Sequence, residues 1–169
     1  MAENLRVTKY NDGSEINSDD YSSYDEGENN LNFFGYLYSR SPFSNNSSNV
    51  CPEGWRTPEK SDVYELKTFL GDDAGSKLAG SVGLWEAGDL RDNAEFGSSG
   101  FNALPGGYYN GLQDLYEYLL SVAYFHMVTP SELMWQSQDR FIIKYDNTSV
   151  DYGMYQFYES YQLSIRCLR

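Results

Sequence analysis

Apart from its carboxylates, few residues in this chain could perform acid–base or nucleophilic chemistry. His126 is the one histidine, and it stands within an apolar run, where packing is the commoner role. A Cys–His nucleophile would need Cys51 or Cys167 beside it in the fold. Two cysteines and one histidine also fall short of a zinc site. These residues therefore predict neither a catalytic centre nor a metal site, and we expect no cofactor.

Carboxylates are plentiful, so an acidic alternative stays open. A pair of Asp or Glu side chains could hydrolyse a glycosidic bond, although an acid-rich chain offers many chance pairs. Scattered Asp and Asn side chains could also bind Ca²⁺. The glycine-rich stretch contains no phosphate-binding GxxxxGK[ST] pattern. We predict a non-enzymatic protein, with a carboxylate-based hydrolase acting on glycans as the alternative.

The C-terminal third has the composition of a binding surface. Its tyrosines are interspersed with Asp, Asn, Ser and Gln, a mixture common in adaptable binding faces. We expect ligand-binding residues at strand ends and hairpin tips, where a rigid sheet presents them. The predicted residues are His126, Trp135, Tyr145, Asp146, Asn147, Asp151, Tyr152, Tyr155 and Tyr158. Because a strand hides every second side chain, about half of the tyrosines are expected in the core instead.

The same third contains the runs that predict an antiparallel sheet. Residues 146–149 (DNTS) are typical of a hairpin turn. In the last run, Leu163, Ile165 and Cys167 share one face. The predicted strands are 123–129, 140–145, 151–157 and 162–168.

The clearest predicted helix follows Thr57. Thr57 is a candidate N-cap, Pro58 suits the first helical position, and Gly71 suits the stop. Apolar residues recur between them at helical spacing: Val63, Leu66, Phe69 and Leu70. A shorter helix is expected over 74–78. With the strands downstream, the chain is predicted to be α+β.

The remaining segments are read as strands and loops. Residues 5–9 and 33–39 resemble short strands. Residues 80–112 are rich in glycine but carry buried-type aromatics, which predicts a long ordered loop.

Length and charge limit the class of protein. The 169 residues suit one domain spanning 1–169, and the aromatic content of 17% favours strands. A net charge of −13 argues against nucleic acid and against an anionic membrane surface. No apolar run reaches membrane-spanning length, so no membrane insertion is expected. The opening MAENLRVTKYNDG shows no signal peptide, so localisation is not readable from a leader.

Four motifs occur together in order, over nearly the whole chain: LRVTKYNDGSEI (5–16), CPEGWRTPEKSDVYELKTFLG (51–71), SSGFNALPGGYYNG (98–111) and LSIRCLR (163–169). They resemble the motifs of the Fibrobacter succinogenes major paralogous domain family. The resemblance implies a C-type lectin-like fold and a secreted or surface protein of Bacteroidetes or Fibrobacteres. Related domains are variable proteins of diversity-generating retroelements, so it implies an adhesin or receptor-binding domain with a protein or glycan ligand. A purely structural surface-protein domain is the remaining reading.

The family motifs also contain both cysteines. The resemblance therefore implies a disulfide between Cys51 and Cys167, with two buried thiols as the alternative in a reducing compartment.

The chain departs from the family pattern in three places. Family members usually have a strand and a tryptophan before the Met-Ala-Glu-Asn-Leu segment that opens this chain. We therefore expect an unpaired sheet edge near 163–168 and either a homo-oligomer or a strand-donating partner. His126 stands where an aromatic is usual. Gln162 and Leu163 stand where a glycine and an aromatic are usual.

Overall fold

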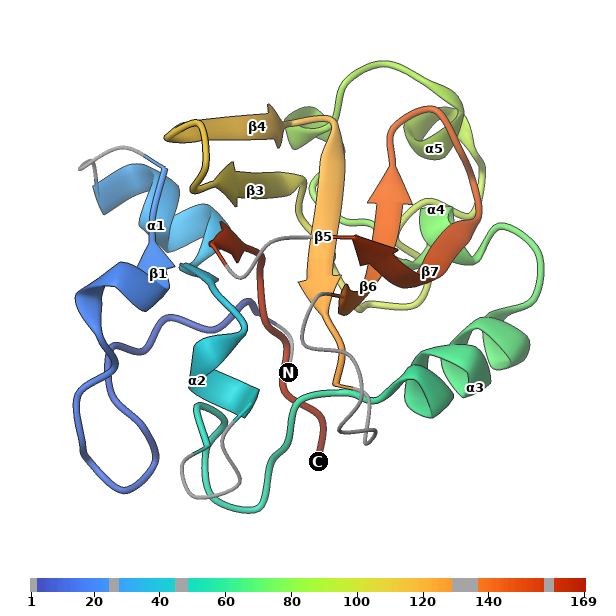
Figure 1. Ribbon diagram of the computed structural model, residues 1–169. Coiled ribbons are helices and arrows are strands. Elements are labelled where there is room, and N and C mark those ends of the chain that lie inside the picture. The colour runs from blue at the N-terminus through green and yellow to red at the C-terminus, as the bar shows by residue number, and fades with distance from the viewer. Residues whose placement is uncertain (1–2, 25–27, 45–48, 129–136, 157–159) are drawn as a thin grey trace.

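The computed structural model describes residues 3–24, 28–44, 49–128, 137–156 and 160–169, and a six-stranded sheet lies at its centre (Figure 1). The strands are β3 (Gly106–Asn110), β4 (Leu115–Leu119), β5 (Val122–His126), β6 (Ser137–Lys144), β7 (Val150–Gln156) and β8 (Tyr161–Gln162). Their order is β4-β3-β5-β6-β7, and β8 pairs with β3. Among the described strand pairs, only β3 and β5 run parallel, at Gly107 and Ala123. The predicted α+β fold with a mostly antiparallel sheet is confirmed.

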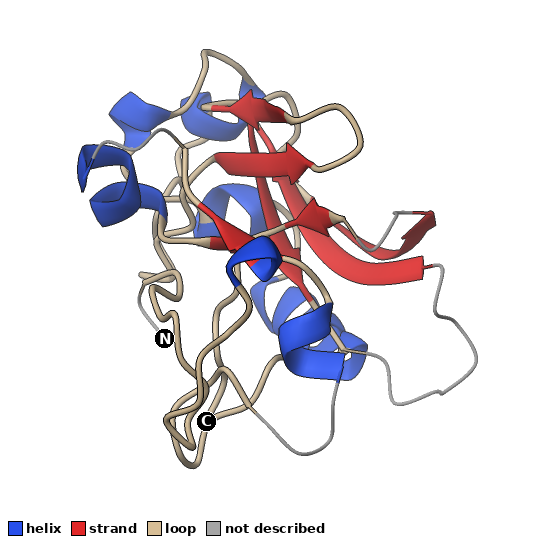
Figure 2. Cartoon of the chain, turned by 60° about the vertical axis from the view of Figure 1, so that its left-hand side comes forward, coloured by secondary structure: helices blue, strands red, loops and turns tan. Residues whose placement is uncertain are grey.

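Helices and a second, two-stranded sheet occupy the chain before β3 (Figure 1). The short sheet pairs β1 (Tyr21–Ser22) with β2 (Leu37–Tyr38). The helical elements are η1 (Ser18–Asp20), α1 (Glu28–Phe34), α2 (Ser41–Ser44), α3 (Lys60–Leu70), α4 (Ala74–Leu78), η2 (Val82–Leu84) and α5 (Asp89–Asp92). Figure 2 shows the strands (red) gathered together with the helices (blue) around them.

The main helix, α3, begins later than its sequence predicts. Its N-cap is Glu59, which forms a capping box with Asp62, so Thr57 and Pro58 lie outside the helix. The predicted stop is correct, because Gly71 takes the left-handed φ of 67°. The predicted short helix over 74–78 is α4.

Two predicted strands and one predicted loop need correction. Residues 33–34 end α1, and Gly35 then turns the chain at φ 73° before β2 begins at Leu37. Residues 5–8 join no strand, and a single bridge pairs Lys9 with Glu15. The stretch 80–112 is not all loop, because it contains η2, α5 and β3.

The described residues form three apolar clusters, and two of them join distant parts of the chain. The larger packs α3, α4 and Trp85 against Phe125, Phe141 and Ile143 of the sheet. The second joins the N-terminal segment to the C-terminal one through Leu5, Tyr38 and Ile165. The Cys51–Cys167 disulfide lies in this second cluster and closes a separation of 116 residues.

The predicted open edge at 163–168 is wrong. Residues 163–167 are buried, and the segment runs between the N-terminal half and the sheet (Figure 1). Its backbone bonds to Leu5, Tyr38 and Arg56 at 2.7–2.9 Å. Ser164 also accepts from the His126 amide at 3.0 Å. The chain itself therefore satisfies the edge that was expected to need a partner.

Among the described residues, no helix is both long and apolar enough to cross a membrane.

Candidate functional site

The tip of the β6–β7 hairpin carries three predicted ligand-binding residues, and two of them are engaged in the fold. Tyr145 packs against the larger apolar cluster, and its amide donates to the Ser121 carbonyl at 2.9 Å. The Asn147 side chain accepts from the Ser149 amide at 2.9 Å, which closes the turn. Asp146 is exposed. This tip is a real hairpin turn, as the DNTS sequence predicts.

The predicted residues of β7 lie on opposite faces of the sheet. Asp151 pairs in register with Ile142, and its carboxylate bonds Lys144 at 3.0 Å. Its neighbour Tyr152 packs on the larger apolar cluster, where Lys67 lies 5.5 Å from its ring centre. The two-residue period of a strand separates them, so they do not form one surface.

The other predicted residues of this region are only partly placed. Tyr155 belongs to β7 and pairs with Gln138 of β6. Trp135 and Tyr158 lie outside the described residues.

His126 lies in the core rather than on a surface, so its predicted role in ligand contact is wrong. The side chain is 1% exposed, and Nε2 donates to the Tyr38 carbonyl at 2.7 Å. Burial lowers the pKa of His126 to about 3; the Tyr38 bond raises it, and the charges of Arg140 and Arg40 lower it further. The imidazole is therefore neutral at physiological pH.

The structure brings together a different set of tyrosines on the side of the sheet away from α3. We call Tyr108, Tyr118, Tyr124, Tyr161, Glu117 and Arg140 the tyrosine face. Tyr108 stands at its centre, with ring centroids 5.8 Å from Tyr118, 5.3 Å from Tyr124 and 5.5 Å from Tyr161. The Arg140 guanidinium lies 5.1 Å from the Tyr124 ring centre, a cation–π distance. β3, β4, β5, β6 and the start of β8 thus each contribute to one cluster, in which Tyr108, Tyr124 and Arg140 are buried.

Tyr118 is the exposed member of this set, and its backbone is unusual. The side chain is 52% exposed, and the residue has a left-handed φ of 60°. In a regular strand, Tyr116 and Tyr118 would point to the same side. Instead Tyr116 contacts Tyr109 and Tyr118 stacks on Tyr108, and these are neighbours on β3. The left-handed residue therefore redirects Tyr118 onto the tyrosine face, at a cost of about 1–3 kcal/mol in backbone strain.

Glu117 fixes the polar part of this surface. Its carboxylate accepts from the Tyr108 hydroxyl at 3.0 Å and from the Asn110 amide at 2.8 Å. Burial, and then the bond to Glu117, raise the pKa of Tyr108 well above its ordinary value. Tyr108 is therefore a neutral donor at physiological pH, and its bond to Glu117 orients its ring.

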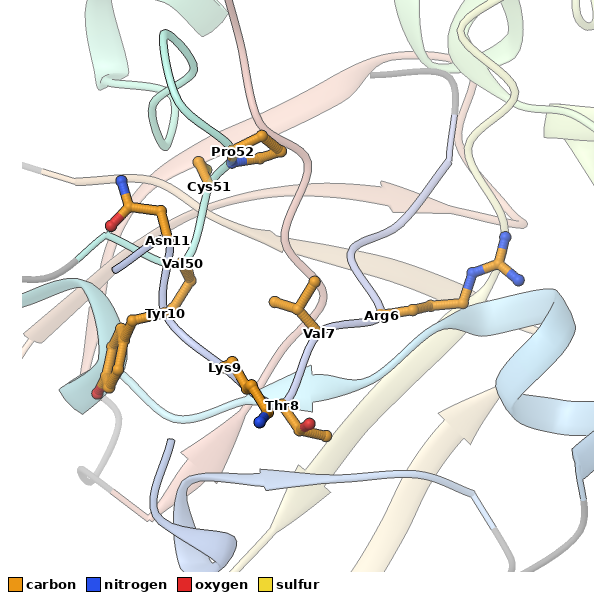
Figure 3. A pocket seen from close by; sticks show the side chains of 9 residues that line it. All are labelled: Arg6, Val7, Thr8, Lys9, Tyr10, Asn11, Val50, Cys51 and Pro52. Carbon is orange, nitrogen blue, oxygen red and sulfur yellow. The ribbon is translucent and has the colours of Figure 1, made fainter. Parts of the chain in front are cut away.

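A pocket elsewhere lies beside the disulfide, between the N-terminal segment and Cys51 (Figure 3). Its lining includes Arg6 and Lys9, but Arg6 pairs with Glu3, and Lys9 pairs with Glu15 at 2.7 Å. Figure 3 shows the Arg6 side chain extending away from the other lining residues. Both cations are therefore engaged in ion pairs with neighbouring glutamates.

The sequence held a signal for this face that the strand predictions missed. Residues 115–119 (LYEYL) have the composition of a strand, and Asn110-Gly111 precedes them as a turn signal. Read together, they predict the β3–β4 hairpin. The position of Tyr118 could not be read in this way, because it depends on a left-handed residue within the strand.

The comparison with protein families decides where this chain belongs. The model described as the Fibrobacter succinogenes major domain matches residues 1–169. The chain belongs to the Fibrobacter succinogenes major domain family. No curated protein and no solved structure matches it.

In this Fibrobacter succinogenes major domain, side chains available for metal binding are dispersed. Across the described ranges, no three His, Cys, Asp or Glu side chains are grouped so that they could hold one ion. The residues that the structure does group together are the aromatic rings of the tyrosine face, with the Glu117 carboxylate and the Arg140 guanidinium.

Proposed function

We propose that this domain is a non-catalytic binding module that holds a protein or glycan ligand against the tyrosine face. The observation that carries the proposal is Tyr118, a large ring that is half exposed and held in a strained conformation. Strain of this kind persists where the surrounding structure enforces it, and it clusters at ligand-binding sites.

The surroundings of Tyr118 suit a binding anchor. Tyrosine offers a large contact area and has few rotatable bonds. The stacking on Tyr108 and the Glu117 bond to Tyr108 order the surface before any ligand arrives. A pre-ordered surface loses less conformational entropy on binding, which favours affinity.

The position of His126 supports the non-catalytic part of the proposal. A general acid or base must reach the proton that it transfers, and this ring is enclosed against the Tyr38 carbonyl.

A binding screen tests the proposal. The protein is first tested against arrays of glycans and of surface proteins, and the affinity for any ligand is then measured with Tyr118→Ala. Because truncating a binding anchor costs about 2 kcal/mol, we expect at least about a 30-fold loss. Tyr64→Ala is the matched control, since Tyr64 is 60% exposed on α3 and contributes nothing to the tyrosine face. Unchanged binding by Tyr118→Ala would contradict the assigned site, and loss with Tyr155→Ala alone would move it to β7.

Membership of the family supports two finer proposals. The first is that the α+β fold is a C-type lectin-like fold of a surface adhesin. The second is that the chain is a retroelement-diversified variable protein. A reverse-transcriptase gene beside this gene, with a template repeat matching the codons of residues 124–162, is the expected result for the second, and a locus lacking both would contradict it.

A further inference from the structure

The strand β4 forms one edge of the central sheet. It pairs with β3 on one side, and no other described strand pairs with it (Figure 1). An edge strand presents backbone N–H and C=O groups that another chain can pair with.

Two features of β4 restrict such pairing locally: Tyr118 has a left-handed φ of 60°, and its carbonyl already accepts from the Ser121 amide at 3.2 Å. Otherwise its sequence, LYEYL, contains no lysine and no proline, and Leu115 and Tyr118 are 54% and 52% exposed. The opposite edge, β7, is treated differently: α3 packs against it, and Lys67 donates to the Val150 carbonyl at 2.9 Å. At β7 the chain itself satisfies the Val150 carbonyl, whereas β4 displays exposed apolar side chains.

The charge around β4 indicates what kind of chain would pair with it. Between Arg91 and Arg140 the sequence contains no lysine or arginine. Glu117 lies in the strand, and Asp114 comes directly before it. A second copy also carries a net charge of −13 over its whole chain, so electrostatic repulsion opposes self-pairing. An extended segment that carries Lys or Arg beside apolar side chains is complementary in both charge and hydrophobicity.

We propose that β4 accepts an extended, basic segment of a partner protein as an added strand, with its apolar side chains against Leu115 and Tyr118. This proposal rests on the proposed binding function, because Tyr118 belongs both to the tyrosine face and to the β4 edge. It specifies the ligand as a protein strand, where the proposed function allows a protein or a glycan.

Backbone N-methylation of a peptide tests this pairing. It keeps the side chains but removes the N–H donors along one edge of the peptide. The probe is a fluorescent heptapeptide of alternating lysine and valine or leucine, measured by anisotropy with the whole chain. Two variants carry N-methyl groups at residues 2, 4 and 6, or at residues 3 and 5, because alternate N–H groups of a strand face opposite edges. We expect one methylated peptide to bind at least about tenfold more weakly, through the loss of two or three hydrogen bonds, and the other within about twofold of the parent.

Two further measurements locate the interaction. Amide hydrogen exchange of residues 115–119 is expected to slow by at least about tenfold in the complex, because pairing protects edge amides. A peptide with glutamate in place of lysine is expected to bind at least about tenfold more weakly, since it repels the acidic edge.

Equal binding by both methylated peptides would show attraction by charge alone and would overturn the proposal. Slowed exchange at another segment, or sedimentation of the free chain as a dimer paired through β4, would also overturn it. If the peptides fail while Tyr118→Ala still abolishes binding of a ligand from the screen, strand addition is wrong and the proposed function stands. If the peptides behave as expected while Tyr118→Ala leaves the screened ligand bound, strand addition stands and the proposed function is wrong.

Discussion

At the scale of single residues, burial decides which side chains can act. His126 and Tyr118 are both large and partly polar, yet one is enclosed and the other half exposed. The ring of His126 is held by a carbonyl 88 residues away in the sequence. Its enclosure makes it a determinant of stability rather than a ligand contact.

The titration of His126 should make the fold sensitive to mild acid. Its pKa is about 3 in the folded chain and about 6.5 when unfolded, so below pH 6.5 the unfolded state binds the extra proton. Stability is thus complete above pH 6.5 and is lost as the pH falls toward 3. We expect the free energy of unfolding in urea to fall by about 2 kcal/mol between pH 7 and pH 5. In His126→Gln, whose amide can replace the Nε2 donor, most of that dependence should vanish; an equally steep fall there would point to other groups.

At the scale of elements, α3 shows how local polar contacts define a boundary. The Asp62 carboxylate accepts from the Glu59 amide at 2.7 Å and binds Arg56 through both oxygens, at 2.6 and 2.8 Å. The Arg56 bond lowers the pKa of Asp62, and the Glu59 amide lowers it further. The helix therefore starts where a side chain satisfies its first free amide, and not at the proline upstream.

Removing this cap should cost measurable stability. We expect Asp62→Ala to lower the free energy of unfolding by about 1–2 kcal/mol, from the lost cap and the lost Arg56 pair. Because the folded pKa is lowered, this difference should be present above about pH 4 and shrink as the pH falls below it. Glu65→Ala is the control: this exposed acid lies on the same helix, and the change should stay within about 0.5 kcal/mol. Equal effects of the two substitutions in urea denaturation would argue against the capping role.

At the scale of the whole molecule, the C-terminal segment joins two halves of the fold. Arg166 is buried there, bonding Asn4 at 2.7 Å and the carbonyls of Phe101 and Asn102. Burial lowers the pKa of Arg166 to about 10, which leaves it charged at physiological pH. One guanidinium thus ties the first residues, the loop before β3 and the last residues together.

The disulfide makes the same connection covalently, and its removal should be costly. Closing a separation of 116 residues stabilises a fold by about 4–5 kcal/mol on the chain-entropy model. We expect a reducing agent to lower the free energy of unfolding by about that amount, measured in urea with and without reductant. The Cys51→Ser/Cys167→Ser double variant should show the lower stability under both conditions. A native protein whose urea midpoint does not respond to complete reduction would contradict this role.

The sequence by itself determined the family, the α+β class, the α4 helix, the stop of α3 at Gly71 and the turn at 146–149. These features depend on residues close together in the chain or on motifs of several residues, so local physical rules predict them. The disulfide followed from the two family motifs that contain its cysteines.

Only the tertiary structure decided which tyrosines are exposed and which are buried. Tyr152 and Asp151 are neighbours in the sequence, but strand geometry places them on opposite faces. Tyr118 reaches the tyrosine face because one residue turns left-handed against its partner strand. His126 and residues 163–167 are enclosed by segments more than 80 residues away, chiefly Tyr38 and Leu5. Exposure depends on contacts through space, which composition and spacing along the chain do not specify.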